Sequence, residues 1–433
     1  MKRRLALSVG DQAVISAFNF ALNLLLIKLW TPEDFGLFAI VAAAALFTTM
    51  IQNAVINTPL AVHLPAVSDA DEKALLRRVF SAANGLLALL VLLLSGGGLL
   101  LWLGTAQLAL VLGASLYMGS QFMREYHRSL LAVEGRLGAL VWVDVAYVVL
   151  SSAALASAHV FAGGQWQTVA VFLLALSATG VLCIAPYLLP RQWPALAALP
   201  GDMRQVFKQQ QHEIRWSLLG AVTTDIQNRG YIFVAAAFFG PITVAHLQAG
   251  RIFFGPLGLL TSAWARVARP QLAMLLGQGD VARFNILMKR ALWAFVAFNV
   301  LFMVALWLAW PYLSALVFSD KYKDLGFLVA AWGVANIAFQ IRSCLSIGVQ
   351  ALRRFRDLTM ATIFGALVSV VLVALACAVN ESTWLIASVI GGECVAVLVV
   401  IRILRRPAAS ETLVAPSNGE SAASTITSQG EPR

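Results

Sequence analysis

Long apolar segments recur along almost the whole chain and are separated by short polar ones. A segment of about 20 apolar residues is long enough to cross the hydrocarbon core of a bilayer as an α-helix. The apolar residues are continuous rather than alternating, which argues against a transmembrane β-barrel. We expect about twelve spans, near residues 8–29, 35–58, 79–103, 107–131, 137–159, 167–189, 289–314, 325–350, 359–379 and 383–404, with a two-span hairpin over 214–264.

A polar segment after residue 190 divides these spans into two groups of six. An even number of spans gives both groups the same orientation, so we expect an all-α membrane protein with two six-helix bundles related by a two-fold axis along the membrane normal. The expected domains are an N-terminal bundle (1–190), a cytoplasmic linker (191–213), a C-terminal bundle (214–404) and a disordered cytoplasmic tail (405–433).

Spacing matches between the two halves support this repeat. Each match joins a polar residue inside a span to a residue near the end of a span: Asn19 with Pro32 and Asn228 with Pro241, both 13 apart, and Arg124 with Arg136 and Arg342 with Arg354, both 12 apart. The first span is expected to remain uncleaved, because polar residues such as Asp11 and Asn19 interrupt it and no small-residue cleavage site follows.

Composition and charge favour a membrane protein and predict its orientation. Hydrophobic residues make up 60% of the 433 residues and charged residues 12%, about half the charge of a soluble protein. The net charge of +10 does not indicate nucleic-acid binding, because most Lys and Arg residues fall in the loops of one side. Such loops face the cytoplasm in membrane proteins, so we expect both termini there.

The sequence contains no recognisable catalytic or metal-binding pattern. Its four cysteines fall in apolar segments without a CxxC pair, which favours small buried hydrophobes over disulfides or a metal site. There is no phosphate-binding glycine loop, no HExxH sequence and no nucleophile elbow. We therefore expect a protein that is not an enzyme and that needs no metal and no cofactor.

Charged residues lie inside the 214–264 hairpin. A charge at mid-membrane costs roughly 2.5–3.5 kcal/mol on insertion scales, so such residues face a partner or a watery cavity. Asp225 and Arg229 are four residues apart, share a helical face and can neutralise each other. Arg251 has no acid three or four residues away on its own helix, so its partner must come from another span, a ligand or water.

Further charges lie in other spans. Arg124 and Arg342 occupy matching depths in the two halves, and Asp144 and Glu393 are among the acids that balance the arginines of the membrane interior. A structural ion-pair network explains some of these charges but need not explain all of them.

Uncharged polar side chains gather in the first two spans. Asn19 belongs to a stripe that follows one face of the first span, with Gln12, Ser16 and Asn23. The stripe is consistent with a cavity lining and equally with hydrogen bonds between helices, which are worth about 0.6 kcal/mol each in membrane proteins. For Asn53 in the second span, packing against a neighbouring helix is the slightly favoured interpretation.

The first two spans also carry a resemblance. The segment SVGDQAVISAFNFALNLLLIKLWTPEDFGLFAIVAAAALFTTMIQNAVI resembles the opening of polysaccharide exporters, the Wzx-type oligosaccharide flippases, whose superfamily also holds the MATE antiporters and the lipid II flippases. Its best marker is the Pro-acidic-aromatic-Gly turn LWTPEDFGLF, at 29–38. The second marker is LLAVEGR, ending at Arg136, with its counterpart VQALRRF, ending at Phe355.

This resemblance implies two bundles around a central cavity with alternating access, in the bacterial inner membrane. It implies an undecaprenyl-diphosphate-linked oligosaccharide as the substrate, with membrane lipids and polysaccharide polymerase machinery as partners. Arginine forks match phosphate oxygens, and amides hydrogen-bond sugars. The expected roles are diphosphate binding for Arg251, Arg229, Arg124 and Arg342, sugar binding for Asn19, Asn53, Asn228 and Gln248, and coupling or ion pairing for Asp225, Glu393 and Asp144.

Two other functions remain open on the sequence. A MATE-like, cation-coupled multidrug antiporter would depend on Asp225 and Glu393, although the membrane arginines argue against a cavity for cationic drugs. A polysaccharide polymerase or ligase usually needs a large outer loop for catalysis, and the outer loops expected here are all short.

Overall fold

The computed structural model describes residues 2–161, 166–188, 199–318, 321–322, 325–352 and 354–405. Within these ranges the chain is helical and contains no strand. The helices are α1 (Lys2–Leu29), α2 (Pro32–Gln52), α3 (Thr58–Ala66), α4 (Ala70–Leu103), α5 (Leu108–Val133), α6 (Leu137–Phe161), α7 (Trp166–Leu188), α8 (Leu199–Phe239), α9 (Pro241–Arg251), α10 (Leu257–Gly277), α11 (Val281–Leu313), α12 (Leu325–Ala351), α13 (Phe355–Ala378) and α14 (Trp384–Arg405).

Two pairs of these helices act as single long segments. A π-helical turn, Asn53–Asn57, joins α2 to α3, and a short 3₁₀ turn, Ile252–Phe254, lies between α9 and α10. The described chain therefore contains twelve long helical segments, as the apolar pattern predicts. Nine of them are long and apolar enough to cross a membrane, judged by length and composition. The other three are α5, α8 and α9–α10, the segments that carry Arg124, Arg229 and Arg251.

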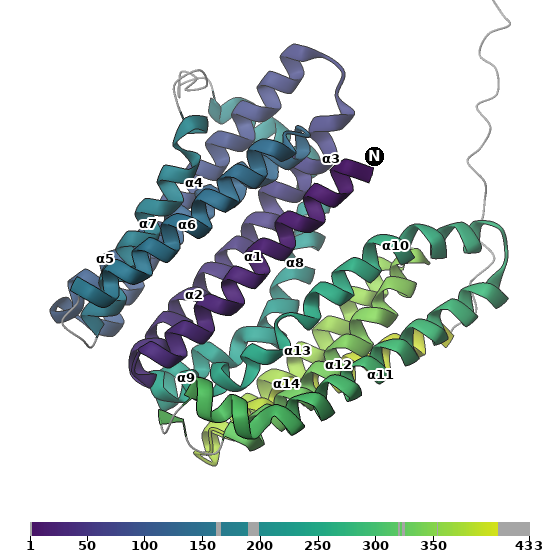
Figure 1. Cartoon of the computed structure of the whole chain (residues 1–433). Helices are drawn as coiled ribbons and strands as arrows, with labels where there is room; N and C mark the ends of the chain where they lie inside the picture. Colours follow the sequence, from purple (N-terminus) through teal and green to yellow (C-terminus); the bar gives the residue numbers. More distant parts are fainter. Residues whose placement is uncertain are drawn as a thin grey trace, which may run out of the picture.

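The helices form two bundles, as expected from the six-plus-six pattern (Figure 1). In the first, α5 packs against α4 and α7, and α6 packs against α1 and α7. In the second, α14 packs against α12 and α13, and α12 also contacts α10 and α11. We call the end of the molecule where α1 begins and α14 ends the inner end, and the opposite end the outer end.

The two bundles meet at the outer end. Helix α2 packs against α9, and both helices begin with a proline, Pro32 and Pro241, the pair that the repeat spacing singles out. Gly36 allows this approach, because a Cβ at this position would collide with the backbone carbonyl of Pro241. Lys321 adds a link by donating hydrogen bonds to the carbonyl oxygens of Lys28 (3.0 Å) and Trp30 (3.3 Å) at the end of α1.

Helix α8 connects the bundles toward the inner end. Its first turns pack on the N-terminal bundle, where Phe207 meets Phe80 with ring centroids 5.9 Å apart. Its later turns pack against α13 and α14. Residues 199–213 of the expected linker are therefore helical and continuous with the seventh long segment. The rest of that linker before residue 199, and the predicted tail from residue 406, lie outside the described residues.

Candidate functional site

A cavity of about 700 Å³ lies between the two bundles, within the usual range for ligand pockets. Its walls come from α1, α2, α8, α9, α10, α12 and α14. The polar residues that line it are Ser16, Asn19, Asn23, Asn228, Arg229, Gln248, Arg251, Asn336 and Glu393, and the aromatic ones are Phe20, Phe35, Phe254, Trp332 and Phe339. We call this space the central cavity.

Arg251 is the last residue of α9, where the eighth long segment is broken. The second arm of the hairpin expected over 214–264 is therefore interrupted, a break that the apolar pattern does not indicate. Pro256 has no backbone N–H to donate to the preceding turn, so the chain passes through a 3₁₀ turn before α10 begins. The partial negative charge at the end of α9 favours a cation at Arg251.

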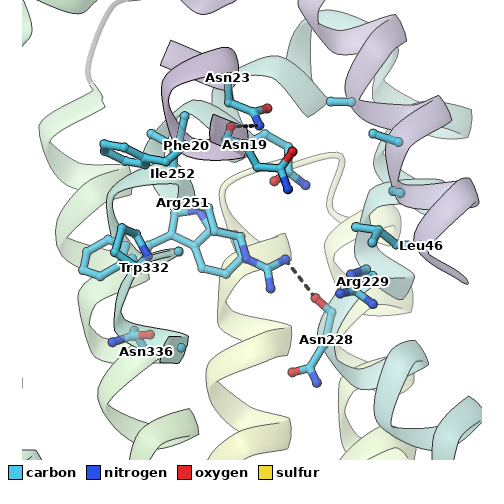
Figure 2. A pocket seen from close by; sticks show the side chains of 18 of the residues that line it. Asn19, Phe20, Asn23, Leu46, Asn228, Arg229, Arg251, Ile252, Trp332 and Asn336 are labelled. Atoms are coloured by element: carbon cyan, nitrogen blue, oxygen red, sulfur yellow. Dashed lines mark hydrogen bonds between the residues drawn. The ribbon is translucent and has the colours of Figure 1, made fainter. Parts of the chain in front are cut away.

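The guanidinium group of Arg251 meets only neutral partners among the described residues (Figure 2). Its Nη1 donates to the backbone oxygen of Asn228 and to the hydroxyl of Tyr231, both at 3.2 Å. Its Cζ lies 5.2 Å from the ring centroid of Trp332, a cation–π contact. Within the described chain no carboxylate oxygen lies within 4 Å of its nitrogens, so this positive charge is left uncompensated inside the cavity.

Arg229 differs from Arg251 although both line the central cavity. Its Nη1 pairs with Asp225, one turn earlier on α8, as the four-residue spacing predicts. The carboxylate is buried, whereas the side chain of Arg229 is 29% exposed. The hairpin therefore presents one neutralised arginine and one uncompensated arginine to the same space.

Arg342 and Glu393 form a buried ion pair across α12 and α14. Arg342 Nε lies 2.6 Å from one carboxylate oxygen and Nη2 lies 3.1 Å from the other, which is the bidentate geometry that arginine forms with carboxylates. Gln227 donates a further hydrogen bond of 3.0 Å to Glu393. Glu393 lines the central cavity, while Arg342 lies behind it, away from that space.

Arg124 lies in a separate charged cluster inside the N-terminal bundle. It is 3.5 Å from Asp144 and 3.2 Å from Glu125, and its guanidinium stacks over Tyr147 at 3.7 Å. Arg128 shares both acids, at 2.8 Å from Asp144 and 2.9 Å from Glu125. None of these residues lines the central cavity.

The predicted sugar-binding amides are divided by the fold. Asn19, Asn228 and Gln248 all line the central cavity, and Gln248 donates to the Tyr231 hydroxyl at 3.3 Å. Asn53 lies elsewhere, exposed in the π-helical turn that follows α2, where its amide oxygen accepts a hydrogen bond from Asn57. The described residues contain no group of three or more His, Cys, Asp or Glu that could hold a metal ion.

Two aromatic residues of the site, Tyr231 and Trp332, were not identified from the sequence. Tyr231 and Trp332 pack against each other at 5.5 Å between ring centroids and hold Arg251 from two sides. Tyr231 follows Asn228 by three residues, so both lie on the side of α8 that faces Arg251. Trp332 carries no such signal, because its contact depends on the packing of α12 against α9.

Comparison with solved structures identifies the fold. The structure superposes on the lipid II flippase MurJ in an inward closed conformation with a TM-score of 0.69 and 13% identity, covering 93% of this chain and 88% of that one. An inward-facing multidrug resistance MATE family transporter of the MOP superfamily gives 0.65 and 16%, covering 90% and 93%. The eukaryotic MATE transporter AtDTX14 gives 0.61 and 13%, covering 93% and 95%. No protein-family model and no curated protein matches the sequence.

These likenesses extend over nearly the whole of each chain, so they concern the complete two-bundle arrangement. The chain is a multi-pass membrane protein with the all-α fold shared by MurJ and the MATE transporters, which confirms the expected fold class.

Proposed function

We propose that this protein is a flippase that moves an undecaprenyl-diphosphate-linked oligosaccharide across the bacterial inner membrane by alternating access. The observation that carries the proposal is Arg251, a cation without an ion-pair partner in a cavity whose two other charged residues, Arg229 and Glu393, are already paired. A diphosphate supplies the missing negative charge, and the guanidinium fork can bind two of its oxygens.

The remaining lining of the central cavity suits a glycan. Asn19, Asn228 and Gln248 offer amide donors and acceptors for sugar hydroxyls. Trp332 and Phe254 add aromatic faces. The polyprenyl tail would stay in the lipid, because the exposed faces of the two bundles are themselves apolar.

The fold supports a transport cycle. Both bundles are closed together at the outer end by the contact of α2 with α9, and structures of this fold in inward-facing and outward-facing conformations are known. Substrate would enter the central cavity from the inner side and leave after this outer contact opens. The MATE-like antiporter is the alternative. It has less support, because both of its expected carboxylates, Asp225 and Glu393, are already paired with arginines.

The proposal is tested by reconstituting the protein with a fluorescent undecaprenyl-diphosphate oligosaccharide in proteoliposomes. We expect the wild type to flip this lipid and Arg251→Gln to lose most of the activity. Arg283→Gln is the matched control, since Arg283 is a surface arginine with a 78% exposed side chain. Equal flipping by all three proteins would remove Arg251 from the mechanism. Efflux of a cationic dye without lipid flipping would favour the antiporter.

A further inference from the structure

A second pocket of about 450 Å³ lies inside the C-terminal bundle, between the central cavity and the inner end. Its walls come from α8, α10, α12 and α13. Phe339 lines both spaces, and the buried ion pair separates them, with Glu393 on the central cavity and Arg342 on the second pocket. We call this second space the inner pocket.

The charges of the inner pocket are all positive. Arg342 and Arg269 line it, and no Asp or Glu does. Glu393 neutralises Arg342 from the far side of the wall. Arg269, on the last turns of α10, is exposed and makes no ion pair with any residue that the structure describes. The pocket therefore offers one positive charge without a counter-charge.

Hydrogen-bond donors follow one face of α12 in the inner pocket. Arg342, Ser346 and Gln350 are spaced by four residues, so they form a stripe along the wall, and Ser343 lies beside it. Ser346 is only 7% exposed, and its hydroxyl has no hydrogen-bond partner in the described structure. A buried hydroxyl without a partner is unfavourable and is usually satisfied by water or a ligand.

We propose that the inner pocket is a second binding site for a phosphoryl group. Arg269 would provide the charge at the inner side, and Ser346, Ser343 and Gln350 would donate hydrogen bonds to its oxygens. A lining with donors and cations but no carboxylate suits an oxyanion and disfavours a cation. The volume of the pocket is ample for such a group.

This site deepens the proposed function and rests on it for its role. A lipid-linked diphosphate that arrives from the inner side would meet Arg269 before it reaches the central cavity and Arg251. The same chemistry would also hold a free phosphate from the cytoplasm. The two sources share one recognition chemistry, and the experiment separates them.

The test is a calorimetric titration of the full-length protein in phosphatidylcholine nanodiscs with inorganic pyrophosphate. Wild type, Arg251→Gln, Arg269→Gln and the double variant are compared, with the surface variant Arg283→Gln as the control. We expect two binding events in the wild type, one in each single variant and none in the double variant. Ser346→Ala should weaken only the Arg269-dependent event, by about ten-fold, since a donor to a charged group is lost.

The outcomes separate this inference from the proposed function. Loss of a binding event in Arg269→Gln, together with its weakening in Ser346→Ala, supports the inner pocket. This conclusion does not depend on Arg251→Gln: if that variant binds as the wild type does, only the proposed central site is contradicted. Binding unchanged by both Arg269→Gln and Ser346→Ala would overturn the inference. Competition by undecaprenyl diphosphate for the Arg269-dependent event identifies the lipid source, and competition by orthophosphate alone identifies a soluble one.

Discussion

The two bundles each bury an arginine at a matching position of the repeat, yet they compensate its charge in different ways. In the C-terminal bundle, Arg342 has one carboxylate, Glu393, held in bidentate geometry beside the central cavity. In the N-terminal bundle, Arg124 shares Asp144 and Glu125 with a second arginine, away from that cavity. In the C-terminal bundle, loss of the single carboxylate would leave Arg342 without a counter-charge. In the N-terminal bundle each arginine contacts two carboxylates, so loss of one acid leaves the other in place.

This difference shows that matching depth does not imply matching function. A buried arginine with its own carboxylate is a structural charge, because removing either partner leaves the other uncompensated. Arg251 differs from both arginines, since no described carboxylate compensates it and it faces the cavity. The distinction between paired and unpaired arginines therefore supports the proposed role of Arg251 more strongly than depth alone does.

The largest effect on stability is expected for Glu393→Gln. This change leaves Arg342 buried and unpaired. Removing one partner of a buried ion pair lowers the free energy of unfolding by roughly 3–5 kcal/mol. Thermal unfolding of the purified protein in detergent would show a large fall in Tm. The double variant Glu393→Gln with Arg342→Met should recover much of the loss. A Tm unchanged by Glu393→Gln would contradict the structural assignment of this pair.

A smaller loss is expected for Asp144→Asn. Glu125 still faces both Arg124 and Arg128 in this variant, so neither arginine is left without a carboxylate. We expect a destabilisation of about 1–3 kcal/mol, in the range for removing a partner from a buried hydrogen bond. The same unfolding measurement ranks it against Glu393→Gln. An equal or larger fall in Tm for Asp144→Asn would show that Glu125 does not compensate the two arginines once Asp144 is lost.

The smallest effects are expected for lysine in place of the two arginines. Arg342→Lys keeps the charge and loses the bidentate fork, which we expect to cost about 1–2 kcal/mol. Arg124→Lys should cost less, because Arg128 holds both acids at 3 Å or below. Chemical denaturation of both variants side by side would check the order. The reverse order would mean that the stacking of Arg124 on Tyr147 matters more than the forks do.

Much of the fold follows from the sequence because bilayer thickness translates directly into the length of apolar segments. The twelve long segments were predictable in this way, although α2 begins at Pro32, three residues before the span expected there. The break after Arg251 was not foreseen, although the pair Gly255-Pro256 is the signal for it. Asn53 could not be placed by helical spacing, since a π-helical turn begins at that residue and changes the register.

The candidate site was only partly predictable. The ion pair of Asp225 with Arg229 follows from a four-residue spacing on one helix. The pair of Arg342 with Glu393 joins two helices and 51 positions of sequence, so no local pattern reveals it. Trp332 likewise reaches Arg251 only through tertiary packing. The sequence therefore supplies the charged residues but not which of them are already compensated.

The central claim is that Arg251 binds the diphosphate of a lipid-linked substrate. The most direct measurement is the affinity of undecaprenyl diphosphate for the wild type, Arg251→Gln and Arg283→Gln in nanodiscs, at a fixed salt concentration. Loss of a charge-assisted, two-point contact predicts binding weaker by about ten-fold to a hundred-fold in Arg251→Gln, and unchanged binding in Arg283→Gln. Equal affinity in all three proteins would contradict the account.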